Sequence, residues 1–417
     1  MATEVAKEVR ESWKTPSVMG SVALVIFVFF GILGRPDSVA FQLSGPRETI
    51  QLPNIDIGSS FLGTVLGVLL LAITGFAALR VSQNKKVPIG LSLVFGAISL
   101  VALLGWLASG SEVPVAFILG SALVLAVPIV LGAMGGVMSE RVGVVNIAIE
   151  GQLLTGAFMA AVISTITGNQ ILGLISASLT AALFSAVLAV FAVRFLAQQI
   201  IVGVVLNVLA IGITNFLYQQ WLTEDESATN SPGTLPIISI PFLSDIPIIG
   251  PVLFQNRITV FMAIAIVILI WFVLFKTKLG LRARAVGEHP LAADTVGINV
   301  GRTRFWWVTI GGLVAGLGGA TLTIGSAGSF GREMSGGLGF IALAVVILGR
   351  WHPGYATAAA LLFGFSIILR IWANQVSPGI PTSFITMVPY LVTLIAVVGF
   401  VGRSRPPAAD GIPYVKG

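Results

Sequence analysis

The sequence contains no cysteine and only two histidines among its 417 residues. Without thiols there is no disulfide framework and no thiolate metal site, and His289 and His352 are too few for a histidine-built zinc site. Charged residues make up 10% of the chain, where a soluble domain carries about 25%. So few charges do not cover a water-facing surface of this size. The sequence therefore predicts a protein covered largely by membrane lipid, with no metal and no cofactor.

The signatures of an enzyme are also missing. The chain has no G-x-x-x-x-G-K-[ST] motif, so it does not form the backbone loop that cradles the phosphates of ATP. No catalytic triad or paired acid and base is recognisable. We therefore expect a non-catalytic membrane protein without an ATPase site of its own.

Long apolar runs recur along the whole chain, close to the ~20 residues that cross a membrane. Twelve such runs predict an all-α integral membrane protein, a polytopic bundle of about 12 transmembrane helices. They cover approximately residues 18–34, 58–79, 88–108, 113–137, 143–166, 171–193, 199–217, 257–275, 305–325, 338–349, 354–371 and 384–402.

The distribution of Lys and Arg predicts the orientation, because cytoplasmic connections retain these residues during insertion. With the N-terminus inside, all but five of the 23 fall on one face. The five exceptions are Arg35, Arg47, Arg257, Arg332 and Arg370. We therefore expect a multi-pass membrane protein with both termini in the cytoplasm. The net charge of +6 is then a topology signal, and no nucleic-acid partner is expected.

Glu150 is the strongest candidate for a functional side chain. It is expected about seven residues into the span that starts at Gly143, where an ionisable group must face protein or water. Asn146 is expected one turn earlier on the same helix face. Asn207 lies at mid-depth of another span, where its amide either contacts a polar solute or joins two helices.

The longest cytoplasmic connection, residues 276–304, reads KTKLGLRARAVGEHPLAADTVGINVGRTR. Pro290 suits the first turn of a helix and Gly297 a left-handed cap, so a short helix is predicted from Pro290 to Val296. Its small residues Ala292 and Ala293 would admit another surface, with the carboxylates of Glu288 and Asp294 beside them. We favour a docking helix for a cytoplasmic partner over an ordinary basic connector.

Two glycine-rich segments have different predicted roles. The run GGLVAGLGGA, residues 311–320, lies inside a span and predicts close helix packing. The run SAGSFGREMSGGLGF, residues 326–340, precedes an apolar stretch of about twelve residues, too short to cross the membrane. A broken or partly re-entrant helix is expected there, lining a cavity or buried in protein. Arg332 and Glu333 within it are candidates for a gate or for a solvated turn.

MSERVGVVNIA, residues 138–148, and MSGGLGFIALA, residues 334–344, match at Met, Ser, Gly and Ala in the same register. One begins inside and the other outside, so the match suggests an inverted repeat in the core. The outer connection, residues 218–256, is rich in proline and apolar residues. It is expected to form a short structured cap or a solvated linker.

Several segments resemble one family. GAMGGVMSERVGVVNIAIEGQLLTGAF, LGLRARAVGEHPLAADTVGINVGRTR, GGLGFIALAVVILGRWHP and the tail GRSRPPAADGIPYVKG are similar to the permeases of ATP-binding-cassette (ABC) importers for ribose, branched-chain amino acids and nucleosides, most of all to the nucleoside branch. The resemblance covers residues 113–417. Residues 1–110, with three spans, lie outside it as an N-terminal extension, residues 111–403 form the permease core, and residues 404–417 form a cytoplasmic tail.

The resemblance implies a permease subunit that forms the translocation pathway for a nucleoside. It implies three protein partners: an ABC ATPase subunit, a second permease subunit, identical or paralogous, and an extracellular lipoprotein that binds the solute. The pathway would include Glu150, Asn146, Asn207 and Phe340. The coupling helix that seats in the ATPase would comprise Gly287, Glu288, His289, Pro290, Ala292, Ala293, Asp294 and Gly297.

Three other functions compete with this one. An ABC permease for simple sugars such as ribose would share the same fold. A self-sufficient secondary transporter would need more ionisable groups at mid-membrane than Glu150 alone. Its largest cytoplasmic loop would be expected midway along the chain, whereas residues 276–304 lie between the eighth and ninth predicted spans. An integral-membrane enzyme would need clustered carboxylates or histidines.

Overall fold

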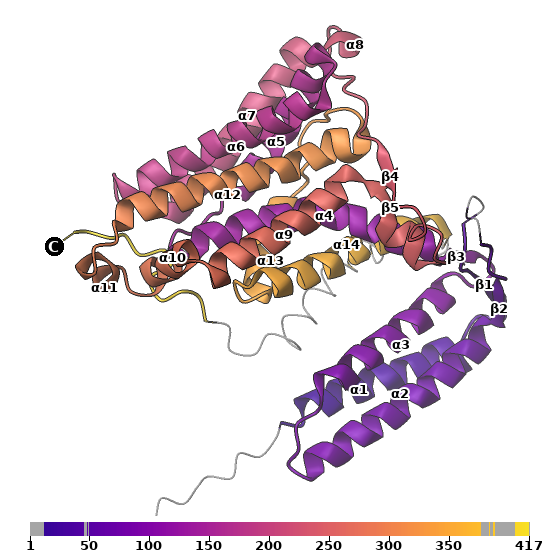
Figure 1. The fold of residues 1–417 in the computed structure, drawn as a ribbon. Coiled ribbons are helices and arrows are strands. Elements are labelled where there is room, and N and C mark those ends of the chain that lie inside the picture. Colours follow the sequence, from indigo (N-terminus) through magenta and orange to yellow (C-terminus); the bar gives the residue numbers. More distant parts are fainter. Residues whose placement is uncertain are drawn as a thin grey trace, which may run out of the picture. The chain divides into compact units, whose positions relative to one another are not determined.

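The computed structural model describes residues 12–45, 48, 50–376, 383, 387 and 405–416. The chain divides into two compact units. The first comprises residues 1–118, 245–248 and 370–387, and the second comprises residues 119–244, 249–369 and 388–417. Figure 1 shows that long helices dominate both units, as an all-α membrane protein requires.

Ten of the twelve predicted spans are long apolar helices in the described part of the chain. They are Lys14–Ile32, Ser59–Ser82, Gly90–Leu107, Val115–Glu140, Ile149–Thr167, Gln170–Val193, Gln199–Leu222, Ile258–Lys276, Val300–Ala327 and Pro353–Val376. The predicted short span is a short apolar helix, Leu338–Leu348. The prediction for residues 384–402 lies outside the described residues, except for Met387.

The first unit packs three spans beside a small sheet. Its helical elements are α1 (Lys14–Val25), the π-helical turn η1 (Ile26–Ile32), α2 (Ser59–Ser82) and α3 (Ile89–Leu107). Strand β1 (Ser38–Gln42) pairs antiparallel with β2 (Ile55–Gly58) and parallel with β3 (Glu112–Pro114). The helices approach closely, because a Cβ on Gly63 would lie 2.2 Å from the Phe30 carbonyl oxygen.

The remaining elements lie in the second unit, except for residues 115–118 at the start of α4 and residues 370–376 at the end of α14, which belong to the first unit. They are α4 (Val115–Glu140), α5 (Ile149–Thr167), α6 (Gln170–Val193), α7 (Gln199–Leu217), η2 (Tyr218–Leu222), α8 (Glu226–Thr229), β4 (Ile237–Ser239), η3 (Gly250–Phe254), β5 (Gln255–Arg257), α9 (Ile258–Lys276), α10 (Lys278–Glu288), α11 (Pro290–Thr295), α12 (Val300–Leu322), η4 (Thr323–Ala327), α13 (Leu338–Leu348) and α14 (Pro353–Val376). Strands β4 and β5 form an antiparallel pair.

Residues 218–256 are structured, since they contain η2, α8, β4, η3 and the start of β5. The prediction of a structured connection is therefore confirmed over that of a plain linker. The connection at residues 276–304 also differs from a loop, because it consists mainly of α10, α11 and the start of α12. Helix α12 begins at Val300, five residues before the predicted start of its span.

Close packing of α5, α6 and α12 depends on the glycines predicted for that role. A Cβ on Gly316 would lie 2.4 Å from the Ala177 carbonyl oxygen of α6, and one on Gly319 would lie 2.1 Å from the Leu153 carbonyl oxygen of α5. Real Cβ atoms do not approach backbone so closely, so any larger residue would push the helices apart. In Figure 1 these helices run alongside one another.

The two segments of the suggested inverted repeat have different local structures. Met138 lies in α4 and Met334 lies in a turn. Gly143 has a φ of 83° outside any helix, whereas Gly339 lies within α13. Residues 138–148 and 334–344 therefore share four residue types in the same register but differ in backbone conformation.

Candidate functional site

Helices α4 and α5 are separated by a break at residues 141–148. The predicted span from Gly143 therefore starts six residues too early, because Gly143 has a φ of 83°, which a right-handed helix excludes. Glu150 is the second residue of α5 rather than the seventh of a span. The prediction that Asn146 shares a helix face with Glu150 is wrong, because Asn146 precedes the helix.

Asn146 belongs to a fully buried polar network. Its amide nitrogen donates to the Gln152 side-chain oxygen at 3.3 Å, and the Gln152 amide donates back to the Asn146 oxygen at 3.2 Å. Gln152 also donates to the Ser185 hydroxyl of α6 at 2.7 Å. All three side chains are inaccessible to solvent. The network therefore holds the break between α4 and α5 against α6.

Asn207 fastens the start of α5 to α7. Its side-chain oxygen accepts from the Gly151 backbone N–H at 2.8 Å, and its amide donates to the Ile147 carbonyl at 2.9 Å. Gln199, at the start of α7, accepts from the Val145 N–H at 2.8 Å. Of the two roles considered for Asn207, these contacts are those of an amide that joins helices.

The Glu150 carboxylate holds the N-terminus of α13. One oxygen accepts from the Ser335 hydroxyl at 2.7 Å and the Gly337 N–H at 2.8 Å, and the other accepts from the Gly339 N–H at 2.6 Å. The N–H groups of Gly337 and Gly339 belong to the otherwise unpaired backbone donors at the start of a helix, where negative charge is favoured. We call this arrangement of Glu150 with Ser335, Gly337 and Gly339 the carboxylate latch.

The latch explains how a charged side chain is accommodated between helices. Glu150 is 5% exposed, so it faces protein as predicted. Gly337 has a φ of 86°, and a Cβ on Gly339 would lie 2.4 Å from the Glu150 nitrogen. Glycine is therefore required for the two backbones to meet. Phe340, the next residue, is 52% exposed on the surface of α13.

A second polar cluster lies next to the latch along residues 330–335. The Asn215 amide of α7 donates to the Glu333 carboxylate at 3.1 Å, and the Arg332 guanidinium lies 5.2 Å from the centre of the Tyr218 ring. Glu333 has a φ of 51°, uncommon for a residue with a Cβ. The fold thus brings together Asn215 and Glu333, which lie 118 positions apart in the sequence.

The short helix predicted from Pro290 to Val296 is confirmed as α11, with Pro290 at its start and Gly297 following it with a φ of 84°. We call residues 287–297 the coupling segment. Its surface offers exposed apolar side chains, with Leu291 61% and Val296 74% accessible. Leu279 and Leu281 of α10 are similarly exposed.

Not all of the predicted coupling residues face outward. Glu288, His289, Ala292 and Gly297 are exposed, and Pro290 and Asp294 are partly so. Ala293 is 3% exposed and packs in an apolar cluster with residues of α6, α7 and α12, so its prediction as a contact surface is wrong. Gly287 is also buried, because a Cβ there would lie 2.2 Å from the Arg141 carbonyl oxygen.

The C-terminal tail, residues 405–416, lies on the coupling segment and was missed as a site by sequence reasoning. The Ala409 N–H donates to the Gly287 carbonyl at 2.9 Å, and the Ala408 N–H donates to the Glu288 carboxylate at 3.2 Å. Figure 1 shows the tail, in yellow, passing α10 and α11. Nothing local in an irregular tail rich in proline and alanine predicts these contacts.

A cluster of charged residues joins the tail to the ends of α4 and α12. Arg304 of α12, expected only as a cytoplasmic charge, is 2% exposed and donates to the Ile412 carbonyl at 2.8 Å. The Asp410 carboxylate is attracted by Arg304 and repelled by Glu140, and Glu140 accepts from the Trp351 indole N–H. Burial raises the pKa of Asp410 to about 7, although Arg304 and the Gly411 N–H act to lower it.

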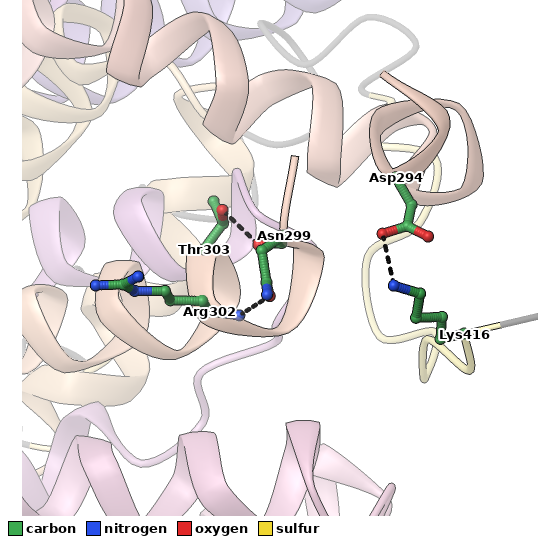
Figure 2. Close-up of polar contacts among 5 residues, drawn as sticks. All are labelled: Asp294, Asn299, Arg302, Thr303 and Lys416. Atoms are coloured by element: carbon green, nitrogen blue, oxygen red, sulfur yellow. Dashed lines mark hydrogen bonds and ion pairs between the residues drawn. The ribbon is translucent and has the colours of Figure 1, made fainter. Parts of the chain in front are cut away.

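A cavity of about 220 Å³ opens between the tail and the start of α12. Arg304, Tyr414 and Lys416 contribute to its lining. Figure 2 shows Asn299, which caps α12 by accepting from the Arg302 N–H at 2.9 Å, and Asp294, which faces Lys416 at 4.0 Å.

Comparison with known proteins assigns the chain to a family. The model of the family described as branched-chain amino acid transport system / permease component matches residues 118–397. Guanosine ABC transporter permease protein NupQ of Bacillus subtilis is 42% identical over 310 residues, which cover 72% of this chain and 97% of that protein. Nucleoside ABC transporter permease protein NupC of Lactococcus lactis is 39% identical over 309 residues, covering 72% of this chain and 96% of that protein.

A putative glucose ABC transporter permease protein of Haloferax volcanii is 35% identical over 253 residues, covering 60% of this chain and 76% of that protein. No solved structure matches. The family match begins where the first unit gives way to the second, so the helices that carry the carboxylate latch and the coupling segment lie within it. This multi-pass membrane protein therefore belongs to the permease-component family of branched-chain amino acid transport systems, which includes ABC transporter permeases.

Proposed function

We propose that this protein is the membrane subunit of an ATP-driven importer for nucleosides. The observation that carries the proposal is the identity of 42% and 39% with guanosine and nucleoside permeases over almost their whole length. The glucose permease is less similar and covers less of the chain, which makes a simple sugar the second candidate. The rival secondary transporter finds no support among these relatives.

An importer of this kind takes its energy from a separate ATPase, because the chain has no phosphate-binding loop of its own. The coupling segment is the proposed docking site. Its exposed Leu291 and Val296 supply apolar contact, and Glu288 supplies a charge at the surface. Apolar side chains surrounded by polar ones are typical of protein interfaces.

The remaining partners follow from the same proposal. A second permease subunit, identical or paralogous, would complete the pathway, and an external lipoprotein would deliver the solute to the connection at residues 218–256. Both termini and the coupling segment would face the cytoplasm of a bacterial cell. The excess of Lys and Arg on that face supports this orientation.

The proposed gating element is α13. With eleven residues it is about 16 Å long, roughly half the hydrocarbon thickness. The helix therefore does not reach from one membrane surface to the other. In this mechanism the carboxylate latch holds α13 in one position, and Phe340 beside it faces the pathway. Asn146 and Asn207 keep the start of α5, and hence the latch, in place.

Reconstitution tests the energy source and the solute together. Vesicles would contain the permease, its co-expressed ATPase and the lipoprotein, and uptake of radiolabelled guanosine would be compared with uptake of glucose. Accumulation of guanosine that requires ATP on the side of the membrane that carries the ATPase supports the proposal. Uphill uptake by the permease alone, driven by an ion gradient, would contradict it. ATP-dependent uptake of glucose in preference to guanosine would show that the substrate is a sugar and not a nucleoside.

A further inference from the structure

We propose that the C-terminal tail, residues 405–416, is a strap that fixes the coupling segment to the ends of α4 and α12 and carries its movement to them. The inference rests on the proposed function, because a coupling segment needs an ATPase to move it. It adds a transmission element that neither the sequence motifs nor the relatives assign. The strap joins parts of the chain about 120 residues apart.

The first attachment is made by backbone. Ala409 donates its N–H to the Gly287 carbonyl at 2.9 Å, so the tail is bonded to the last turn of α10, immediately before α11. On its other side Gly287 lies against the Arg141 carbonyl, 2.2 Å from where a Cβ would be. The end of α10 is thus held between the tail and the residue that follows α4. Backbone bonds of this kind fix position without depending on a particular side chain.

The second attachment is the buried guanidinium of Arg304. It donates to the Ile412 carbonyl at 2.8 Å and to the Ala409 carbonyl at 3.5 Å. Gly143, in the break after α4, makes room for this contact, because its Cβ would lie 2.8 Å from both the Ala409 oxygen and the Arg304 nitrogen. A buried cation needs such partners, and here the tail supplies them.

Asp410 does not itself fasten the tail, because Arg304 of α12 attracts its carboxylate whereas Glu140 of α4, a second carboxylate, repels it. One of its oxygens is buried without a hydrogen-bond partner among the described residues. The exposed pair of Lys416 and Asp294 in Figure 2 is weaker, because it is 4.0 Å long and Lys416 is 76% exposed. The strength of the strap is therefore concentrated at residues 408–412.

These contacts have a mechanical consequence. A partner that pushes on α11 displaces Gly287 and Glu288, and through Ala408 and Ala409 it displaces the tail. The tail is in turn bonded to Arg304 of α12, a helix that also packs on α5, which carries the carboxylate latch. The strap therefore offers a route from the docking surface to the core that does not pass along the intervening chain.

Hydrogen exchange of the permease alone, in lipid nanodiscs, tests the attachment without any ATPase. A chain truncated after Ser404 and the variant Ala409→Pro, which removes the N–H that reaches Gly287, are compared with wild type. We expect amide exchange at residues 285–297 to accelerate at least tenfold in both. The matched control is Val415→Pro, at a tail residue that is 65% exposed, which should leave the rate unchanged. Unchanged exchange in both variants would overturn the strap.

Addition of the ATPase tests transmission. In variants that still retain the ATPase on purification, we expect solute-stimulated ATP turnover to fall at least tenfold, while turnover of the free ATPase is unchanged. Faster exchange with normal stimulated turnover would reduce the tail to a stabilising segment and overturn the proposal. If wild-type protein binds no ATPase, the proposed function fails, but the exchange result still decides whether the tail holds the coupling segment.

Discussion

Two short helices of the second unit, α13 and α11, are each held by a different device. Helix α13 has eleven residues and α11 has six, and helices this short are not stable by themselves. A single carboxylate, Glu150, anchors α13, whereas α11 follows a turn of α10 that is bonded to the backbone of the tail. A charge concentrates the attachment in one side chain, and a backbone strap distributes it over several residues. Single substitutions should therefore affect the two helices unequally.

Glu150→Ala is expected to have the largest effect. It removes the acceptor of Ser335, Gly337 and Gly339 together and leaves these buried or partly buried donors unpaired, which costs about 3 kcal/mol of stability. Thermal unfolding in detergent and guanosine uptake measure the two consequences. Glu150→Gln keeps one oxygen and should lose less stability while still altering uptake. The exposed Glu224→Gln is the control, and an equal effect of all three would argue against the latch.

Gly287→Ala is expected to come next. The added methyl would lie 2.2 Å from the Arg141 carbonyl oxygen, so α10 must shift away from the break after α4, at a cost of about 2 kcal/mol. Gly297→Ala provides a comparison of another kind, since no atom lies near but its φ of 84° introduces strain alone. If Gly287→Ala unfolds at the wild-type temperature, the end of α10 is not tightly held.

The effect of pH on stability through Asp410 of the tail is expected to be smaller than that of Gly287→Ala. The pKa of Asp410 is raised from its ordinary 3.8 to about 7, so the folded protein binds more protons than the unfolded chain between these values. The contribution of Asp410 to the free energy of unfolding should therefore fall by about 1–2 kcal/mol as the pH rises from 5.5 to 7.5 and change little above that range. Chemical unfolding at a series of pH values measures this slope. Asp410→Asn should flatten it, and an unchanged slope would assign the effect to other groups.

Lys416→Ala should have the smallest effect, below about 0.5 kcal/mol, because its pairing with Asp294 is long and exposed to solvent. It should also leave hydrogen exchange in α11 as in wild type. A loss comparable with that of Gly287→Ala would place the main attachment of the tail at its end instead of at residues 408–412.

Local signals explain which elements were predictable. Apolar length marked the ten long helices, Pro290 and Gly297 marked the ends of α11, and the glycines at 316 and 319 marked close packing. These features depend on neighbours in sequence or on the size of one side chain. The start of α5 was misplaced because an apolar run continues through Val144 and Val145, while the left-handed Gly143 and the buried bonds of Asn146 break the helix.

Contacts between distant segments were not predictable. Glu150 is expensive in a membrane and so was recognisable as important, but its partners at 335–339 are backbone groups that carry no residue signature. Ala409 likewise reveals nothing in sequence of its bond to Gly287. Arg304 looked like any positive charge near a span, although its side chain is buried beneath the tail.

Composition and periodic hydrophobicity alone thus determined that this chain crosses the membrane many times and carries no phosphate loop, because transfer to lipid depends on each segment's own residues. The tertiary structure alone decided which charges are buried and what they hold. Those pairings join residues more than 100 positions apart, as Arg304 to Ile412 and Glu150 to Gly339 do. Their free energy arises only when helix packing excludes water from both partners at once.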